Sequence, residues 1–562
     1  MTAELSPAPW LRIHREMGVE PAPFDDRDLG RCVADHAHTN GSAPALRFMQ
    51  RTFSYGELDE LANRLANVLT GLGVGRGDVV GVHLPNLPQY AIAVVAIARV
   101  GCVGSGVSPL LAPGELQHQI RDAGISVLLS LPELIAPALA GMDAVPECLH
   151  SVVTTAPGDC LGAPPALVPS LPGVAAHTWS ELMPGAATTF DAVASQPDDT
   201  FMIQYTGGTT GRPKGAMLSV RTLLSNPRMT AVYLPWEDAG EVVATAFPMF
   251  HVAGLSFVIG GLALGAQVLL IPDPRDIEHF CQQMIACPPT RMGGVPTVYQ
   301  MLVNHPTSRQ IDFSRLRTAA TGAAPLTGED RTRIEALLGQ GKLCDVFGMT
   351  ETGPVHTMNP PGRIKPDAVG IPLPGADTRI VDLETGAGEM PRGEPGEIIT
   401  SGPQVMQGYL NLPDESARAL RQWHGRTWMY TGDVGFMDDE GYIHLCDRAK
   451  DMLIVGGYKV FSVEVEDKLA DLAAIERVAV VGTPDPVRAG SEVVHLFVQL
   501  APQAADRDRT ELRQEITGFC RANMSPYKVP KVIEFIPELP LTPVGKIDKK
   551  VLREQARRAA SG

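Results

Sequence analysis

The chain has 562 residues, and because one hydrophobic core usually splits beyond about 250–300 residues, two or more domains are expected. Hydrophobic residues make up 44% of the chain and charged residues 20%, which excludes global disorder. The net charge of −16 argues against a general binder of nucleic acids or anionic membranes. An anionic ligand therefore needs a local site of positive charge or backbone donors.

The cysteines and the first residues bear on the compartment. Nine cysteines are scattered without a CxxC pair, and "MTAELSPAPWLRIHREMG" has no apolar segment typical of a signal peptide. Both features predict a reduced, cytoplasmic protein. The longest apolar stretch, Val258–Ile271, is too short and too rich in glycine to span a bilayer. It predicts the end of a core helix followed by a strand.

Strand-like runs alternate with helical patterns along most of the chain. The run Val79–Leu84 predicts a strand, and Gln89–Gly101 predicts the helix that follows it. Another helix is delimited by Thr327 as N-cap, acidic residues in its first turn and Gly339 as its stop. This alternation predicts an α/β fold with largely parallel sheets.

The stretch "YTGGTTGRPKGAM" (Tyr205–Met217) follows the apolar run "FMIQYT", a predicted buried strand. Its glycines leave backbone N–H groups exposed, and successive N–H groups form a concave anion site. Threonine hydroxyls and Lys214 add further donors, so the stretch predicts a phosphate loop. It differs from a Walker A loop because Gly215, and no Ser or Thr, follows the lysine. A plain surface turn is the alternative.

Two later turns carry carboxylates. In "VFGMTETG" (Val346–Gly353), Glu351 follows a strand-like run, and a carboxylate there suits Mg²⁺, which prefers oxygen ligands. In "YTGD" (Tyr430–Asp433), the carboxylate suits the two hydroxyls of a ribose. Taken singly, each turn is explained as well by a solvated surface turn.

The character of the sequence changes near Asp447. Charged residues cluster there, Gly456 and Gly457 then permit close backbone approach, and a unit of roughly a hundred residues follows. This change places a domain boundary between 447 and 448, which gives domains 1–447 and 448–562. Lys546 precedes a predicted terminal helix. Taken in isolation, these features are explained equally by a salt-bridged linker and a solvated lysine.

The five motifs together, in this order, resemble the adenylate-forming superfamily of acyl-CoA synthetases, adenylation domains and luciferases. The resemblance runs from "FSYGELDELANRLANVL" to "GKIDKK" and includes "FPMFHVAG", "TGAAPL" and "GEIITSGPQVMQGYL". Within the superfamily, the chain is most similar to bacterial fatty acid–CoA ligases, through "QYTGGTTG", "GPQVMQGY" and "YKVPKVIEF". The resemblance implies an α/β fold: a large N-terminal domain of layered sheets and helices, and a small, mobile α+β C-terminal domain that carries a catalytic lysine.

The resemblance also implies roles for the matched residues. The ATP triphosphate would be cradled by Thr206, Gly207, Gly208, Thr209, Thr210, Gly211 and Lys214. The nucleotide base would be framed by Gly322, Ala323, Ala324, Asp345 and Phe347, with Met349 also in the nucleotide site. Asp433 would bind the ribose hydroxyls with help from Arg448, and Lys450 would stand at the interdomain hinge. The approach of the thiol would be lined by Gly456, Gly457 and Tyr458.

The catalytic group implied in the same way consists of four residues. Thr350 would contact the α-phosphate and Glu351 would hold Mg²⁺. Lys546 would act in adenylation, and His251 would border the acyl pocket together with Gly348.

Two positions depart from the residues usual in the family, and a further set of small residues bears on the acyl pocket. Phe347 stands where the family often has Tyr, which keeps a stacking face but loses a hydroxyl. Ser462 stands where the family commonly has Pro, and we expect it to act as the N-cap of the next helix. Gly348 and the small residues of Met292–Pro296 are expected to leave the acyl pocket open, which disfavours acetate as the substrate.

The resulting hypothesis is an acyl-CoA synthetase that uses ATP, Mg²⁺ and CoA. It would activate a medium- or long-chain fatty acid to acyl-AMP with release of pyrophosphate, and then transfer the acyl group to CoA. Alternatives are an aromatic or cyclic acid, a carrier-protein thiol as the acceptor, and a nucleotide-binding regulator without catalysis. The absence of a recognisable carrier domain disfavours the second alternative, and the presence of Glu351 and Lys546 disfavours the third.

The expected partners are small molecules: the acid, ATP and CoA. No nucleic acid and no transmembrane segment are expected. The sequence leaves a homodimer and a peripheral membrane contact open.

Overall fold

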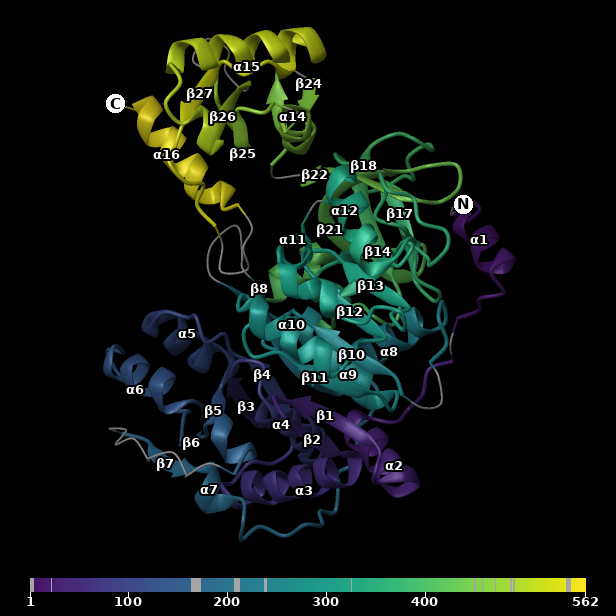
Figure 1. Ribbon diagram of the computed structural model, residues 1–562, viewed down its shortest axis with the longest axis vertical. Helices are drawn as coiled ribbons and strands as arrows, with labels where there is room; N and C mark the ends of the chain where they lie inside the picture. The colour runs from purple at the N-terminus through teal and green to yellow at the C-terminus, as the bar shows by residue number, and fades with distance from the viewer. Residues whose placement is uncertain are drawn as a thin grey trace. The chain divides into compact units, whose positions relative to one another are not determined.

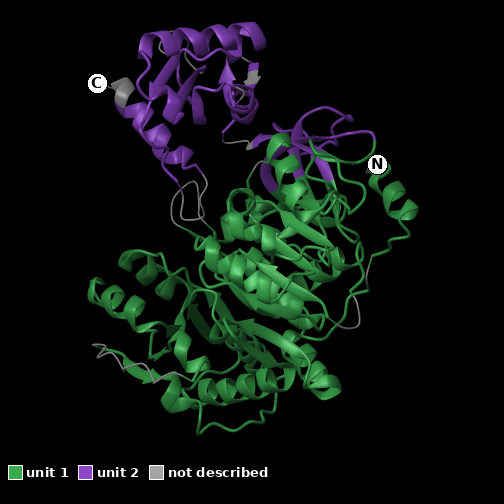
Figure 2. Ribbon diagram, viewed as in Figure 1, with its two compact units in different colours: residues 1–378, 399–430, 440–443 green, residues 379–398, 431–439, 444–562 purple. Residues whose placement is uncertain are grey.

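The computed structural model in Figure 1 describes residues 5–21, 23–162, 173–206, 213–236, 240–324, 326–448, 451–456, 458–470, 472–485, 488, 491–541 and 547–561. The chain divides into two compact units (Figure 2). Unit 1 comprises residues 1–378, 399–430 and 440–443, and unit 2 comprises residues 379–398, 431–439 and 444–562. The single boundary between 447 and 448 stays a prediction, because two short earlier segments also group with the C-terminal part.

An eight-stranded sheet in unit 1 is built mainly from parallel strands. In spatial order the strands are β19 (Gly408–Tyr409), β9 (Lys214–Ser219), β8 (Thr200–Thr206), β4 (Val103–Gly106), β3 (Val79–His83), β5 (Ile125–Ser130), β6 (Ser151–Thr154) and β7 (Ala175–Thr178). The two exceptions are β9, which pairs with β8 in antiparallel fashion, and β19, which pairs with β9 in the same way. All five residues of β3 are buried, which explains its continuous apolar run.

A nine-stranded sheet completes the strand framework of unit 1. Its spatial order is β16 (Ile371–Pro372), β15 (Val355–Met358), β14 (Leu343–Gly348), β13 (Thr318–Thr321), β12 (Arg291–Gly294), β10 (Val242–Thr245), β11 (Gln267–Leu270), β1 (Pro44–Phe48) and β2 (Arg51–Ser54). The strands from β14 to β1 run parallel, and β2, β15 and β16 add antiparallel edges. The prediction of largely parallel sheets is confirmed.

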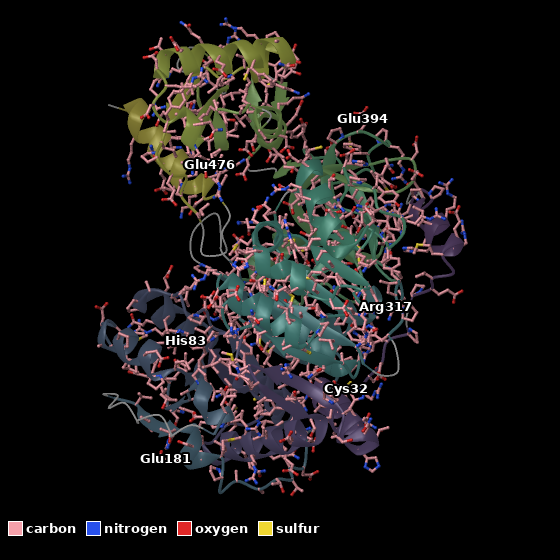
Figure 3. The ribbon with its side chains drawn as sticks, in the orientation of Figure 1. Cys32, His83, Glu181, Arg317, Glu394 and Glu476 are labelled. Atoms are coloured by element: carbon pink, nitrogen blue, oxygen red, sulfur yellow. The ribbon has the colours of Figure 1, made fainter. Side chains whose placement is uncertain are left out.

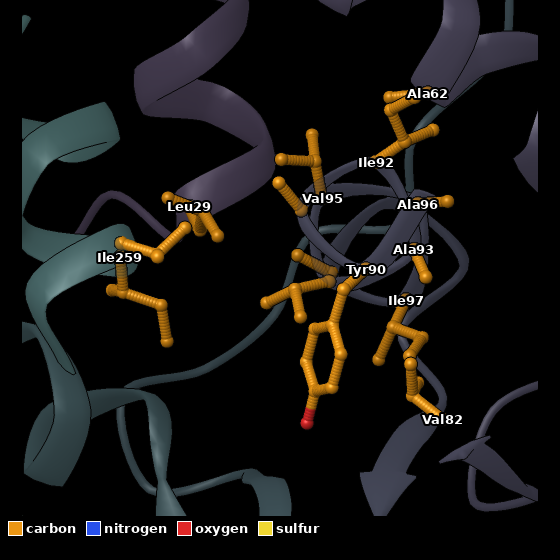
Figure 4. Close-up of a cluster of buried hydrophobic side chains, with 14 of the residues drawn as sticks. Leu29, Ala62, Val82, Tyr90, Ile92, Ala93, Val95, Ala96, Ile97 and Ile259 are labelled. Carbon is orange, nitrogen blue, oxygen red and sulfur yellow. The ribbon is translucent and has the colours of Figure 1, made fainter. Parts of the chain in front are cut away.

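Helices join these strands in unit 1. They are α1 (Trp10–Glu16), α2 (Leu29–Asn40), α3 (Tyr55–Gly71), α4 (Pro88–Val100), α5 (Pro113–Ala123), α6 (Pro132–Ala140), α7 (Trp179–Leu182), α8 (Val220–Ala231), α9 (Val252–Ala263), α10 (Ile277–Ala286), α11 (Pro296–Asn304), α12 (Gly328–Leu338) and α13 (Pro413–Ala419), with short 3₁₀ turns η1 (Pro157–Cys160), η2 (Pro306–Gln310) and η3 (Thr350–Thr352). The core combines residues of α2, α3, α4, α8 and α9 with strands of both sheets. Figure 4 shows part of this core around α4, with Leu29 of α2 and Ile259 of α9 beside it.

Helix α4 shows why the sequence folds in this way. It begins with Pro88 at its first turn and ends at Gly101, whose φ of 70° is left-handed. All thirteen of its residues are buried, and most of them are apolar, as expected for a helix with other elements on every side. The helix predicted at Gln89–Gly101 is therefore confirmed.

The remaining strands form one sheet with residues from both units and the smaller sheets of the C-terminal part. A five-stranded sheet has the order β17 (Asp377–Val381), β18 (Gly396–Ser401), β21 (Arg426–Met437) and β20 (Leu420–Trp423), with β22 (Ile443–Arg448) paired to β21. The C-terminal part contains β23 (Leu453–Val455), β24 (Tyr458–Val460), α14 (Ser462–Leu469), β25 (Ile475–Pro484), β26 (Glu492–Leu500), η4 (Pro502–Ala504), α15 (Arg509–Asn523), η5 (Pro526–Lys528), β27 (Val532–Phe535) and α16 (Lys549–Ser561). Strands β25, β26 and β27 form one sheet, and α14, α15 and α16 pack on it.

Two predictions about helix ends have different outcomes. The Thr327 side chain accepts a hydrogen bond from the Asp330 N–H and caps α12, as expected. The expectation that Ser462 caps the next helix is wrong, because Ser462 is the first residue of α14 and Phe461 precedes it without a side-chain cap. The Ser462 hydroxyl accepts a hydrogen bond from Lys549 at 2.7 Å instead.

The structure adds two observations on the compartment prediction. All nine cysteines are free thiols, and Cys32, labelled in Figure 3, is one of the buried ones. Among the described residues, no helix combines the length and apolar character needed to cross a membrane. Neither observation tests the cytoplasmic location itself.

The core of unit 1 yields a stability prediction. Ile97 is fully buried on α4, and replacing it with Ala removes buried surface and leaves a cavity, which costs about 2–5 kcal/mol. Leu110 is 58% exposed, so Leu110→Ala is a matched control that should stay within about 0.5 kcal/mol of wild type. Urea unfolding followed by circular dichroism measures both. Equal midpoints for the two variants would contradict this account of the core.

Candidate nucleotide site

Several predicted site residues gather at one edge of the nine-stranded sheet. Strands β10, β12, β13 and β14 are parallel, so the loops that follow them leave from the same edge. His251 follows β10, Gly322 follows β13, and Glu351 follows β14. Ligands of open parallel sheets bind beyond the carboxyl ends of the strands.

The base of the predicted phosphate loop is an antiparallel pair. Thr206 ends β8 and Lys214 begins β9, and the two residues are directly paired. The Tyr205 hydroxyl donates to Asp122 Oδ2 at 2.6 Å, which anchors this end of β8. The loop itself, with Gly207, Gly208, Thr209, Thr210 and Gly211, lies outside the described residues.

The turn with Thr350 and Glu351 is a buried 3₁₀ turn, η3. Thr350 is 8% exposed and Glu351 is 5% exposed. The Thr352 hydroxyl accepts a hydrogen bond from the Met349 N–H at 3.0 Å, and Gly353 ends the turn with a φ of 58°. The turn is therefore fixed by its own sequence, and the interpretation of Glu351 as solvated surface is wrong.

Neighbouring elements hold the same turn in place. The Asn226 side chain on α8 donates to the Val355 carbonyl at 2.6 Å, and the Glu351 carbonyl accepts from the Met406 N–H at 2.9 Å. Both β8 and β9 lie in contact with η3. The carboxylate turn and the base of the phosphate loop are thus neighbours.

A chain of polar contacts links these two parts. The Tyr409 hydroxyl donates to Glu351 Oε1 at 2.6 Å. The Lys214 ammonium lies 5.1 Å from the Tyr409 ring centroid and 2.6 Å from Glu415 Oε2. Burial, and next the Glu351 charge, raise the pKa of Tyr409, so the phenol stays protonated and can donate. The hydrogen bond from Lys214 lowers the pKa of Glu415.

Glu351 fits Mg²⁺ in its chemistry and its burial. Within the described ranges, no group of three or more His, Cys, Asp or Glu side chains could hold a metal ion. Mg²⁺ is usually held by one or two carboxylates together with substrate phosphates and water. One buried carboxylate beside the base of a phosphate loop meets that requirement.

The turn at Gly322 passes close to the neighbouring strand. A Cβ at Gly322 would lie 2.5 Å from the Val346 carbonyl oxygen, so only glycine fits there. Ala323 adopts a φ of 68°, which is uncommon for a residue other than glycine. Ala323 and Ala324 are both exposed. This strained, open backbone is the kind found at ligand sites.

Asp345 and Phe347 are fixed by side chains that the sequence motifs did not indicate. Asp345 accepts from Arg331 and, at 2.9 Å, from the Asn359 amide. Burial raises the pKa of Asp345, and Arg331 opposes this rise. The Phe347 ring meets His356 edge-on, with ring centroids 5.1 Å apart. Burial lowers the pKa of His356 to about 3, which keeps that ring neutral.

His251 occupies the N-cap of α9, where its Nδ1 accepts from the Ala253 N–H at 3.2 Å. The loop before it is held by Asn86, which donates to the Phe247 carbonyl at 3.1 Å and accepts from the Met249 N–H at 2.7 Å. The position of His251 at the sheet edge thus depends on a buried asparagine from another loop.

Gly348 does not simply leave space for an acid. A Cβ at Gly348 would lie 2.0 Å from the Pro354 carbonyl oxygen and 2.9 Å from the Val355 Cα. In the Met292–Pro296 segment, a Cβ at Gly293 would lie 2.1 Å from the Phe257 ring. At Gly348 and Gly293 the absence of a side chain permits close packing, and a large residue at 348 would displace the turn that carries Glu351. An acyl pocket left open by these positions stays a prediction.

The remaining predicted residues belong to unit 2. Asp433 is buried on β21, and its N–H donates to the Thr431 hydroxyl at 3.1 Å. Gly456 has a φ of 60°, and Tyr458 is 59% exposed and stacks on Tyr527 with ring centroids 4.5 Å apart. Arg448 ends β22. Lys450, Gly457 and Lys546 lie outside the described residues, so their roles stay predictions.

Besides Arg331, Asn359 and His356, sequence reasoning missed Asn86, Tyr409 and Glu415, which also organise this region. Tyr409 lies inside the motif "GPQVMQGYL", which is part of the resemblance, but the motif indicates no role for this residue. Asn86 and Glu415 gave no comparable signal, because their partners are 163 and 201 residues away in the chain.

Comparison with known families agrees with this geometry. The AMP-binding enzyme family model matches residues 33–410, and the model of the AMP-binding enzyme C-terminal domain matches residues 464–546. The chain belongs to the AMP-binding enzyme family. The adenylate-forming fold, with a large N-terminal and a small C-terminal domain, is confirmed by this match and by the structural similarity below.

Several enzymes of known activity resemble the chain over nearly its whole length. A long-chain-fatty-acid–CoA ligase of Bacillus subtilis (strain 168) is 34% identical and covers 98% of both chains. A feruloyl-CoA synthase of an Amycolatopsis species is 33% identical over 94% of this chain and 99% of its own. The crystal structure of the anthranilate CoA ligase AuaEII in complex with anthranoyl-AMP superposes with a TM-score of 0.83 at 26% identity, covering 96% of this chain and 99% of that one.

The close approach at Gly348 yields a prediction. Gly348→Ala should displace the turn that carries Glu351 and slow acid-dependent AMP formation about 10²-fold, the usual effect of a misplacement of about 1 Å. Gly294→Ala is the matched control, because its Cβ would have no neighbour closer than 3.5 Å. The rate of AMP formation at saturating ATP measures both. A normal rate for Gly348→Ala would show that the close approach has no consequence.

Proposed function

We propose that the protein is an AMP-forming acyl-CoA synthetase with the site residues named above in the roles that the resemblance implies. The observation that carries the proposal is the buried turn of Thr350 and Glu351 against β9, at the base of a glycine- and threonine-rich loop. Similarity to ligases that form acyl-CoA over nearly the whole chain supports the same activity.

The first half-reaction joins two anions, so its main requirement is the neutralisation of charge. A carboxylate oxygen of the acid bonds to the α-phosphorus, the bond to the β-phosphate bridging oxygen breaks, and pyrophosphate leaves. Lys214 and the N–H groups of the loop that begins at Thr206 would bind the β- and γ-phosphates. Mg²⁺, held by Glu351, would supply positive charge beside the phosphate oxygens.

The second half-reaction needs no protein nucleophile. The CoA sulfur bonds to the acyl carbon, the bond from that carbon to the phosphate oxygen breaks, and AMP leaves with this oxygen. Gly456, Gly457 and Tyr458 would line the approach of the thiol. Withdrawal of Lys546 and rotation about Lys450 belong to the proposal through the resemblance.

The proposed acid is a long-chain or medium-chain fatty acid, because the Bacillus subtilis relative is a long-chain-fatty-acid–CoA ligase. An aromatic acid is the second candidate, because the Amycolatopsis relative is named a feruloyl-CoA synthase and AuaEII an anthranilate CoA ligase. The proposal also places the enzyme in the cytoplasm.

The products and the acid can be tested in one assay. With ATP, Mg²⁺, CoA and a panel of acetate, octanoate, palmitate, ferulate and anthranilate, we expect AMP and pyrophosphate in amounts that depend on the acid, with a fatty acid as the best substrate. Chromatography of the nucleotides measures the products. ADP and phosphate as the only products would contradict the mechanism, and ferulate or anthranilate as the best acid would select the second candidate.

The division of labour between the half-reactions gives a second test. Lys546→Ala should slow acid-dependent pyrophosphate release about 10²–10³-fold, the cost of one lost transition-state charge donor. It should still convert supplied acyl-adenylate and CoA to the thioester at a near-normal rate. Gly457→Leu should show the reverse, because its side chain obstructs the thiol.

Lys531→Ala is the matched control for this test, since Lys531 is 61% exposed and pairs with Asp485 at 3.2 Å. It should leave both half-reactions unchanged. Equal losses in both half-reactions for a folded Lys546→Ala variant would contradict the division of labour.

A further inference from the structure

Tyr409 contacts the carboxylate proposed to hold Mg²⁺ and the lysine proposed to bind the phosphates. Its hydroxyl donates to Glu351 Oε1 at 2.6 Å, and the Lys214 ammonium lies 5.1 Å from its ring centroid. The two contacts use different parts of one side chain, the hydroxyl end and the ring face. A single buried residue therefore links the proposed metal carboxylate with the proposed phosphate lysine.

The backbone around Tyr409 is fixed on both sides. Tyr409 pairs with Ala216 of β9, and its N–H donates to the Ser416 hydroxyl at 2.8 Å. Three residues earlier, the Met406 N–H donates to the Glu351 carbonyl at 2.9 Å. The segment 406–409 thus joins the backbone of η3 to the backbone of β9. The Tyr409 side chain joins the same two elements through Glu351 and Lys214.

The type of donor matters for a metal ligand. A neutral hydroxyl orients a carboxylate without cancelling its charge, whereas an ammonium in the same place would compete with a bound cation. Outer partners of this kind hold metal ligands in position and strengthen them. Lys214 is directed elsewhere, to Glu415 at 2.6 Å, while the electron-rich ring face of Tyr409 attracts its charge.

We propose that Tyr409 is a positioning residue of the ATP site: its hydroxyl orients Glu351 for Mg²⁺, and its ring face holds Lys214 for the phosphates. The inference rests on the proposed function, which assigns those two roles. The competing interpretation is that Tyr409 is only a core residue, since it is 8% exposed and packs in the main hydrophobic cluster. In that case its hydroxyl would matter for stability alone.

The experiment measures binding of ATP to the full chain by isothermal titration calorimetry, with Mg²⁺ and with EDTA. The ratio of the two dissociation constants is the metal coupling. Tyr409→Phe keeps the ring and loses the hydroxyl, so we expect the coupling to fall about 10–100-fold while the affinity in EDTA stays at the wild-type value. Tyr409→Leu also loses the ring face, and its affinity in EDTA should fall about two- to fivefold.

Tyr55→Phe is the matched control, because its hydroxyl also donates a buried hydrogen bond, to the Ala266 carbonyl at 2.8 Å, and its ring packs in the same hydrophobic cluster as Tyr409. It should keep the wild-type coupling. Glu351→Gln provides the reference loss, and Tyr409→Phe combined with Glu351→Gln should lose no more than Glu351→Gln alone, because both changes act through one carboxylate.

Three results would overturn the role of Tyr409: wild-type coupling in Tyr409→Phe, equal loss of affinity with Mg²⁺ and with EDTA, or the same loss of coupling in Tyr55→Phe. Wild-type coupling in Glu351→Gln would instead overturn the metal role of Glu351 in the proposed function. The two failures are therefore distinguishable.

Discussion

The short pairing of Gly408–Tyr409 with β9 is the contact on which the rest of the candidate site depends. Strand β9 begins at the end of the predicted phosphate loop, and β19 is its outer neighbour in the sheet. From this position Tyr409 reaches Glu351, which follows a strand of the other sheet. The contacts of β8 and β9 with η3, and the hydrogen bond from the Met406 N–H to the Glu351 carbonyl, join the same two parts of the site.

Close backbone approaches set the shape of the same region. Gly322, Gly348 and Gly254 each meet a backbone oxygen so closely that a Cβ would lie within 2.5 Å of it. Small residues at this edge therefore bring segments together, and they do not create empty space. This packing brings several turns of the candidate site close together.

The sequence predicted much of the fold because parallel strands and buried helices leave continuous apolar runs, as β3 and α4 show. The sequence also indicated a strand that ends before Thr350 and Glu351, and the structure has this strand as β14. The roles of these two residues in ATP binding rest on the resemblance and stay predictions. The sequence did not predict the close approach at Gly348, because the motif does not show that β14 and β15 pair across the turn with Gly348 opposite Val355. The prediction that Ser462 caps the start of α14 is wrong, because the Ser462 hydroxyl accepts a hydrogen bond from Lys549, which lies far along the chain.

The central claim is that the carboxylate of the acid attacks the α-phosphorus of ATP before the thiol attacks the acyl carbon. The most direct measurement uses a fatty acid labelled with ¹⁸O in both carboxylate oxygens and follows the label by mass spectrometry. The account predicts that each AMP released with acyl-CoA carries one ¹⁸O atom, and that pyrophosphate carries none. AMP without label, or label in the pyrophosphate, would contradict it.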